Sequence, residues 1–153
     1  MNAQTNEGFS LTINRHIPAN RNAVFGAWTR AELLTRWFSP SADFRVVVLE
    51  LDLRVGGRYR IEMHEADGIH TVYGEYIEIS RPDRLVFTWA WEHSDDGAQM
   101  LVTVELTEDP DGTALTLLHE KLPSETSRDL HNEGWDGCLS RLATALESQP
   151  GSE

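Results

Sequence analysis

The sequence predicts an α+β domain in which a long, curved antiparallel sheet packs against one C-terminal helix. Between about Asp43 and Leu122, apolar residues alternate with polar ones in successive segments that are separated by short turn signals. Pro123-Ser124 then opens a single long amphipathic segment, which is predicted to be a helix. Strands joined by short turns pair in an antiparallel way, and one helix cannot cover the concave side of such a sheet. We therefore expect a pocket between the helix and the sheet.

The N-terminal part of the chain is predicted to form one strand and two short helices. Residues Phe9–Ile13 alternate between apolar and polar side chains, and Pro18 ends this strand. Asn20 is suited to cap the first helix, because its side-chain oxygen can accept a hydrogen bond from a backbone N–H of the first turn. Residues Thr29–Glu32 have the spacing of a capping box for the second helix, and Pro40 is expected to end that helix.

Six further strands are predicted after these helices. The signals that separate them are Gly56-Gly57, Asp67-Gly68, Pro82-Asp83, Asp95-Asp96-Gly97 and Asp109-Pro110-Asp111-Gly112. Alternation assigns one face of each strand to the side of the long helix. The side chains assigned to that face are Tyr59, Ile61, Met63, Tyr73, Glu75, Ile77, Ile79, Leu85, Phe87, Trp89, Trp91, Val102, Val104, Leu106, Leu115, Leu117 and His119. The matching stripe of the helix carries Trp135, Leu139, Leu142 and Leu146.

We interpret residues 8–148 as one domain, with residues 1–7 and 149–153 as flexible tails. The single cysteine, Cys138, excludes an intramolecular disulfide and favours a reducing compartment. The N-terminus lacks the pattern of a secretory signal, and no apolar run approaches the ~18 residues of a membrane helix. These observations predict a cytoplasmic protein that does not insert into a membrane.

The charge of the chain argues against one class of partner. The sequence carries 25 acidic and 13 basic residues, which give a formal net charge of −12. Such a surface repels phosphate backbones, so nucleic-acid binding is not expected.

Six short motifs occur in order along almost the whole chain. They are Ala27-Trp28-Thr29, Arg36-Trp37-Phe38, Gly56-Gly57-Arg58-Tyr59, Gly74-Glu75-Tyr76-Ile77-Glu78-Ile79, Arg84-Leu85-Val86-Phe87-Thr88-Trp89 and Gly134-Trp135. This set resembles the SRPBCC (START/Bet v 1-like) superfamily, and within it the bacterial homologues of the activator of heat-shock-protein-90 ATPase. The resemblance implies a helix-grip fold, with a seven-stranded curved antiparallel sheet around the C-terminal helix and two short helices after the first strand. It also implies a cavity for an apolar small molecule.

Our leading hypothesis from the sequence is therefore binding of an apolar or amphipathic small molecule between the long helix and the sheet. Five tryptophans in 153 residues can fill a core, and they can also form an aromatic wall around a ligand. The side chains predicted to contact the ligand are Trp37, Tyr59, Ile61, Met63, Tyr73, Glu75, Phe87, Trp89, His119, Trp135 and Leu139.

An enzyme is the first alternative. Alternation places Glu75 and His119 on the faces that point at the long helix. A carboxyl and an imidazole that share one apolar cavity have pKa values that move apart, and such a pair can transfer protons in a cyclase, isomerase or hydrolase. Glu75 and His119 are thus the candidate catalytic residues. The opposing interpretation is that the register slips at Gly74, which would turn Glu75 toward water.

No cofactor or metal is expected. No His or Cys cluster has the spacing of metal ligands, and Gly56-Gly57 opens no helix that could bind a dinucleotide. There is no Gly-x-Ser-x-Gly nucleophile motif, and Cys138 is expected to be partly buried and unreactive. The remaining alternative is a protein-interaction module, such as a stress-related or co-chaperone-like regulator or one subunit of a homodimer. The resemblance alone does not imply work with a chaperone, because the eukaryotic activator engages its chaperone through an additional N-terminal domain.

Overall fold

The computed structural model of the chain describes residues 8–92 and 98–147. Its elements, in order, are β1 (Phe9–Ile17), α1 (Arg21–Thr29), α2 (Ala31–Trp37), β2 (Arg45–Leu51), β3 (Arg58–Glu65), β4 (Gly68–Ser80), β5 (Arg84–Trp91), β6 (Met100–Asp109), β7 (Gly112–Leu122) and α3 (Glu125–Glu147). All neighbouring strands are antiparallel, and their order across the sheet is β1-β7-β6-β5-β4-β3-β2. The predicted α+β helix-grip fold is confirmed. The two predicted tails and the Asp95-Asp96-Gly97 turn fall outside the described residues.

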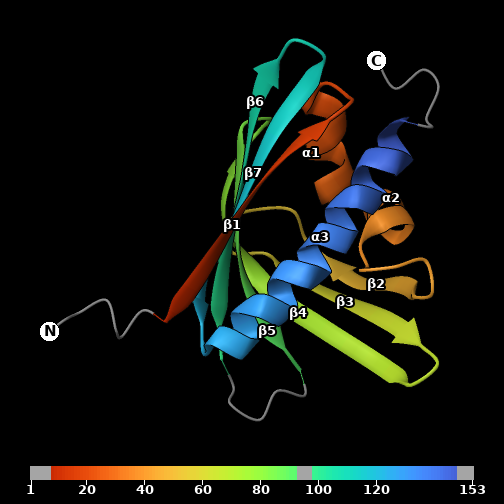
Figure 1. Cartoon of the computed structure of the whole chain (residues 1–153), viewed down its shortest axis with the longest axis vertical. Helices are drawn as coiled ribbons and strands as arrows, with labels where there is room; N and C mark the ends of the chain where they lie inside the picture. The colour runs from red at the N-terminus through yellow and green to blue at the C-terminus, as the bar shows by residue number, and fades with distance from the viewer. Residues whose placement is uncertain (1–7, 93–97, 148–153) are drawn as a thin grey trace, which may run out of the picture.

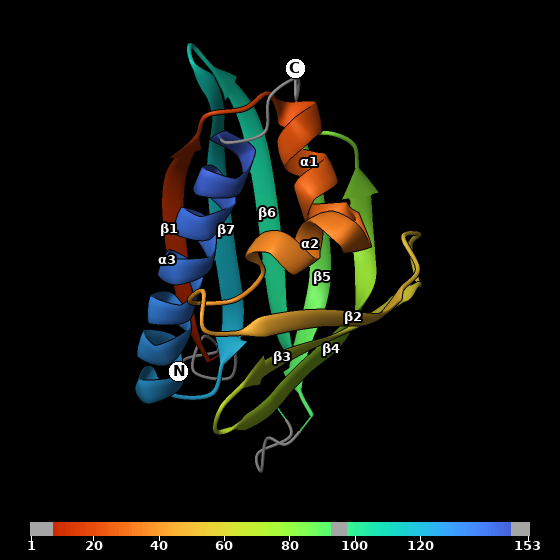
Figure 2. The same cartoon turned by 90° about the vertical axis from the view of Figure 1, so that its right-hand side faces the viewer.

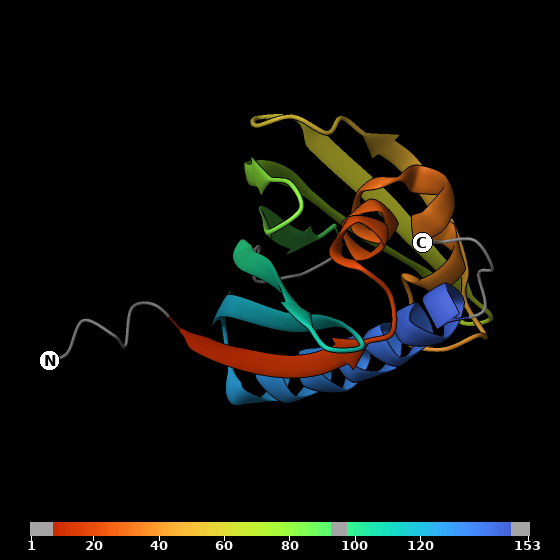
Figure 3. The ribbon, with the colours of Figure 1, turned by 90° about the horizontal axis from the view of Figure 1, so that it is seen from above.

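The three helices lie on the same face of the sheet (Figures 1 and 2). Seen from above, the sheet bends around them (Figure 3). Helix α3 packs along β1 and β7 and against α2, whereas α1 packs against β6, β7 and the other two helices. The start of α3 and the turn between β3 and β4 lie at the same end of the molecule, opposite α1 (Figures 1 and 2). No helix in the described ranges is both long and apolar enough to cross a bilayer.

The two short helices begin in different ways. Asn20 caps α1 as predicted, because its Oδ1 accepts from the backbone N–H of Ala23 at 2.8 Å. The predicted capping box of α2 is wrong, since the residue before that helix is Arg30 and no side chain caps it. Thr29 is instead the last residue of α1, and its hydroxyl donates to the carbonyl of Phe25 at 2.8 Å. Because Thr29 still belongs to α1, it lies one residue before the N-cap position of α2 and cannot cap that helix.

Two of the predicted tight turns form where the sequence places them. Glu65 pairs with Gly68 across the turn between β3 and β4, and Asp109 pairs with Gly112 across the turn between β6 and β7. The Asp-Gly signals therefore fix the register of both hairpins. This register matters for the site, because it sets which side chains of β3 point at α3.

The face of β4 that was predicted to point at α3 is the outer face. Tyr73 and Ile77 are 40% and 47% exposed, and Glu75 is also exposed. The buried side chains of this strand are Thr71, Val72 and Tyr76. The prediction that Tyr73 and Glu75 line the pocket is therefore wrong.

Gly74 explains this error. It lies on the inward row of β4, where an added Cβ would meet the Thr88 carbonyl oxygen at 2.0 Å and the Tyr59 ring at 2.7 Å. The inward row of β4 therefore has no side chain at its centre. In the sequence the outer row, with Tyr73 and Ile77, is the more continuous apolar row, so alternation assigns it to the buried side. A register shift between Tyr76 and Glu78 then changes the alternation further along the strand.

Candidate functional site

One large pocket opens between the first half of α3, the segment after α2, the β3–β4 hairpin and β5. Its volume is about 460 Å³. We call it the indole pocket, because three tryptophans contribute to its walls. Its lining residues are Phe38, Pro40, Phe44, Met63, Glu65, His70, Trp89, Trp91, Leu130, His131, Gly134, Trp135 and Cys138.

Helix α3 presents one continuous face to the indole pocket. Leu130, His131, Gly134, Trp135 and Cys138 follow the spacing that brings side chains to the same side of a helix. Gly134 lies at the centre of this face, and a Cβ added there would have no atom within 4 Å. The absence of a side chain at this position thus leaves open space beside the helix backbone.

A second glycine of the same helix has the opposite role. A Cβ added at Gly137 would lie 2.2 Å from the carbonyl oxygen of Pro40. Gly137 therefore permits close approach between α3 and the segment after α2. The two glycines together bring the helix close to its neighbour on one side and leave room on the other.

The pocket runs from an exposed rim to a buried floor. Its buried lining residues are Phe38, Met63, Trp89, Trp135 and Cys138. At the rim, Leu130 is 62% exposed, and His70 is also exposed. The rim thus lies between α3 and the β3–β4 hairpin, where no strand ladder has to open for a ligand to pass.

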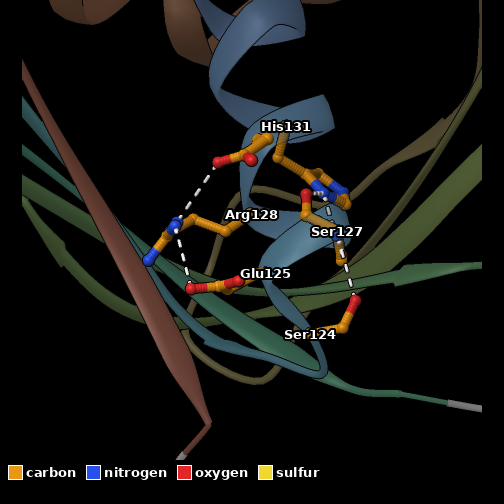
Figure 4. Close-up of polar contacts among 6 residues, drawn as sticks. Ser124, Glu125, Ser127, Arg128 and His131 are labelled. Atoms are coloured by element: carbon orange, nitrogen blue, oxygen red, sulfur yellow. Dashed lines mark hydrogen bonds and ion pairs between the residues drawn. The ribbon is translucent and has the colours of Figure 1, made fainter.

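His131 is held neutral at the wall of the pocket. The indole N–H of Trp91 donates to its Nε2 at 2.9 Å, so the proton of the imidazole is on Nδ1. Nδ1 donates to the carbonyl of Ser127 at 2.7 Å (Figure 4). Burial lowers the pKa of His131. Although the Ser127 hydroxyl is 3.3 Å from Nδ1, a protonated nitrogen cannot act as its base, so this pair is not an activated nucleophile.

His119 makes a similar pair deeper in the molecule. The indole N–H of Trp135 donates to its Nδ1 at 2.9 Å, and its Nε2 lies 3.3 Å from the sulfur of Met100. His119 is fully buried, and burial together with the neighbouring His131 lowers its pKa to about 3. The imidazole is therefore neutral, and its lone pair is already occupied.

The predicted proton-transfer pair of Glu75 and His119 is not formed. Glu75 is exposed on the outer face of β4, where its backbone N–H donates to the hydroxyl of Thr88 at 2.9 Å. His119 lies inside the core, with Trp135 on its acceptor nitrogen. The acid–base chemistry expected from this pair has no geometric basis.

The other predicted contact residues divide into three groups. Met63, Trp89 and Trp135 line the indole pocket. Tyr59, Ile61 and Phe87 surround a separate cavity of only about 20 Å³. Trp37 and Leu139 are buried in the core and line neither cavity, with the Trp37 indole N–H bonded to the Ala27 carbonyl at 3.0 Å.

Much of the pocket lining was missed from the sequence. The missed residues are Phe38, Pro40, Phe44, Glu65, His70, Trp91, Leu130, His131, Gly134 and Cys138. Helical spacing from Trp135 could have found His131 and Cys138, and alternation from Met63 could have found Glu65.

Two indole N–H groups have no hydrogen-bond partner in the described part of the chain. They belong to Trp28 and Trp89, and both are buried. Trp28 borders the small cavity and Trp89 the indole pocket. A buried donor without an acceptor costs free energy. Trp89 differs in this respect from Trp91 and Trp135, whose indole N–H groups donate to histidines.

The remaining polar groups of the pocket offer no metal site and no reactive thiol. Within residues 8–92 and 98–147, no group of three or more His, Cys, Asp or Glu side chains could hold a metal ion. Burial raises the pKa of the Cys138 thiol to about 12. Glu65 accepts a hydrogen bond from Nε2 of His70 at 2.6 Å.

Comparisons with known proteins agree on the fold and the family. The family model described as "Activator of Hsp90 ATPase homolog 1-like protein" matches residues 18–147. Among solved structures, a protein from Chromobacterium violaceum is similar with 26% identity and a TM-score of 0.85, over 92% of this chain and 98% of that one. An AHSA1-like protein from Aeromonas hydrophila has 29% identity and a TM-score of 0.77, over 95% and 96% of the two chains. An AHSA1 protein from Silicibacter pomeroyi has 27% identity and a TM-score of 0.77, over 91% and 98%. The comparison with curated proteins found no match.

Proposed function

The chain belongs to the family of activator of Hsp90 ATPase homolog 1-like proteins, and from this premise we propose that it binds one apolar or amphipathic small molecule in the indole pocket. The observation that carries the proposal is a pocket of about 460 Å³ with a largely apolar and aromatic lining. Sites for small molecules are typically concave, mostly apolar and ~300–1,000 Å³ in volume. The fold also supports the proposal, because hydrophobic ligands are common in this fold family.

The expected affinity is moderate. A ligand that buries ~250 Å² of apolar surface gains roughly 6 kcal/mol at ~25 cal/mol per Å². The loss of translational and rotational freedom subtracts from this gain. The gain alone corresponds to a dissociation constant of roughly 40 μM, so after these costs tighter binding requires polar or cation–π contacts in addition to apolar burial.

The groups around the pocket suit binding better than proton transfer. The acceptor nitrogen of His131 is occupied by the Trp91 indole, and the pKa of the Cys138 thiol is about 12. Neither side chain is poised to act as a base or nucleophile near neutral pH. The lining therefore supports a binding role.

The proposal is tested with the neutral fluorescent probe N-phenyl-1-naphthylamine. We expect enhanced probe fluorescence and energy transfer from tryptophan in the native chain. Replacing Gly134 with leucine fills the open space beside α3, so the probe affinity should fall by at least roughly ten-fold, as expected when about 1.4 kcal/mol is lost. Native mass spectrometry of freshly purified protein would independently reveal a small molecule that co-purifies.

Gly26 provides a matched control. It is also a helical glycine whose added Cβ has room, since the nearest atom is Arg30 Cδ at 3.8 Å, and it does not line the indole pocket. Gly26→Leu should leave probe binding unchanged. Equal binding by the native chain and by Gly134→Leu, with both folded by circular dichroism, would refute the site.

A further inference from the structure

Building on the proposed function, we infer that the ligand of the indole pocket is an organic cation, with an apolar body among the indoles and an ammonium group near Glu65. The inference depends on three features of the pocket: the charges in its lining, the aromatic walls, and the position of one carboxylate.

The described residues of the lining include no lysine or arginine that would neutralise an anion. Glu65 is the one carboxylate among these described residues, and the ring of His70 at the rim is already paired with it. The charge of Arg141 acts on the Cys138 thiol, but its guanidinium donates to the Ser39 hydroxyl and to the carbonyls of Ser41 and Arg36, and it does not line the pocket. A carboxylate or phosphate ligand would therefore lose its hydration without gaining a positive partner.

The net charge of the whole chain also favours a cationic ligand over an anionic one. Its formal net charge is −12. A cleft in a strongly acidic protein concentrates cations and repels anions. His131 adds no positive charge to the wall, because burial lowers its pKa and the Trp91 indole occupies its acceptor nitrogen.

The walls are suited to a cation. Five aromatic rings line the pocket, from Phe38, Phe44, Trp89, Trp91 and Trp135. The face of an aromatic ring carries partial negative charge, and tryptophan attracts cations most strongly. Aromatic cages of this composition are the usual receptors for quaternary ammonium groups, whose methyl groups also require apolar contact.

Glu65 is placed to complete such a cage. It follows Met63 on the inward row of β3, and its side chain is 28% exposed, between the buried floor and the solvent. Its Oε2 accepts from His70, whose ring lies beside Phe44 with the centroids 6.1 Å apart. A carboxylate offers about four lone-pair sites, so it can attract an ammonium group while it holds His70.

The test uses three probes with one naphthalene body. They are (naphthalen-2-ylmethyl)trimethylammonium, its neutral isostere 2-(2,2-dimethylpropyl)naphthalene, and the anion 2-naphthylacetate. Binding is measured from the indole N–H resonances in ¹H–¹⁵N spectra of the full chain. We expect the cation to bind at least roughly ten-fold more tightly than the neutral isostere, and the anion to bind more weakly than both.

Glu65→Gln should remove most of the preference for the cation and leave the affinity for the neutral isostere unchanged. Glu62→Gln is the matched control, because Glu62 also pairs with a histidine, His64 at 2.8 Å, and lies outside the pocket. A second measurement does not depend on a variant. Higher ionic strength should weaken binding of the cation and not of the neutral probe, since screening acts on charge.

The outcomes separate this inference from the proposed function. If the neutral isostere binds as tightly as the cation, or if the anion binds most tightly, the inference is wrong and the apolar site remains. If none of the three naphthalene probes and no N-phenyl-1-naphthylamine binds, the proposed function itself fails. Retention of the cation preference in Glu65→Gln, with the preference insensitive to salt, would also overturn the role of Glu65.

Discussion

Trp135 donates its indole N–H to Nδ1 of His119 at 2.9 Å, which ties the middle of α3 to the last strand of the sheet. Trp91 and His131 make the same kind of bond between β5 and α3, also at 2.9 Å. The two imidazole rings contact each other, with centroids 4.8 Å apart. Each indole thus satisfies an imidazole nitrogen, and the two pairs together fix how α3 sits above the sheet. His119, which the sequence suggested as a proton carrier, instead accepts a hydrogen bond that holds α3 against the sheet.

The Trp135–His119 bond predicts a contrast between two tryptophans of the same pocket. Trp135→Phe removes a donor and leaves the buried Nδ1 of His119 unsatisfied. Trp89→Phe removes an N–H that has no partner among the described residues. We expect Trp135→Phe to lower the free energy of unfolding by about 1–3 kcal/mol more than Trp89→Phe does.

Urea unfolding of both variants measures this difference. Similar ring area is lost in each, so the packing terms should largely cancel. An equal or smaller loss in Trp135→Phe would show that the indole–imidazole bond does not stabilise the fold.

The low pKa of His119 predicts a dependence of stability on pH. Its pKa is about 3 in the folded chain, below its ordinary value of 6.5. Between these values the unfolded chain binds the extra proton, so the contribution is fully present above about pH 6.5 and is lost as the pH falls toward 3. A fully titrating histidine lowers the free energy of unfolding by roughly 1.4 kcal/mol per pH unit in this range.

His119→Gln is the control for this pH dependence. Glutamine can still accept from Trp135 through its carbonyl, but it does not titrate. The fall in unfolding free energy from pH 6.5 to pH 5 should be smaller in His119→Gln than in the native chain, by about 2 kcal/mol. Some dependence should remain, because burial also lowers the pKa of His131. Parallel pH profiles for the two chains would contradict the assignment.

The two glycines of α3 predict opposite effects for the same substitution. Gly134→Ala adds a methyl group where no atom lies within 4 Å, so improved helix propensity should stabilise the chain by about 1 kcal/mol. Gly137→Ala forces a methyl group to within 2.2 Å of the Pro40 carbonyl oxygen, so it should destabilise by at least roughly 1–3 kcal/mol. Thermal unfolding followed by circular dichroism compares them directly. Effects of the same sign would mean that α3 lies differently against Pro40.

The elements and the hairpins could be predicted because their signals are local. The positions of the strands, the Asn20 cap and the Asp67-Gly68 turn each depend on a few neighbouring residues, and all three are confirmed. The inward face of β4 could not be predicted, because it has a glycine at its centre. Gly74 has no side chain there, and the Tyr59 ring of β3 occupies the space that a side chain would need. This packing between two strands leaves no pattern in the sequence of β4.

The sequence predicted an apolar, aromatic pocket beside the long helix, but not which residues line it. The sequence placed it between the long helix and the sheet, and only Met63, Trp89 and Trp135 of the predicted contacts line the indole pocket. Its position is set by the start of α3 meeting the β3–β4 hairpin, and these segments are far apart in the chain. Leu130 and His131 were missed because the predicted stripe of the helix followed the core residues nearer its C-terminal end.

Cys138 predicts a direct report on pocket occupancy. Burial raises the pKa of its thiol to about 12, which lowers the thiolate fraction near pH 8 by about a thousand-fold relative to an ordinary value of 9.0. Since it is the one cysteine of the chain and lines the indole pocket, N-ethylmaleimide should modify the folded protein slowly and at a single position. The same chain in urea should react at the rate of an ordinary thiol. A bound ligand should slow the folded reaction further, because it covers the pocket wall and raises the free energy of local opening.

Mass spectrometry of the modified fraction with time measures all three rates. Rapid labelling of the native chain, or labelling that is indifferent to a saturating probe, would mean that Cys138 does not face the space in which the ligand sits.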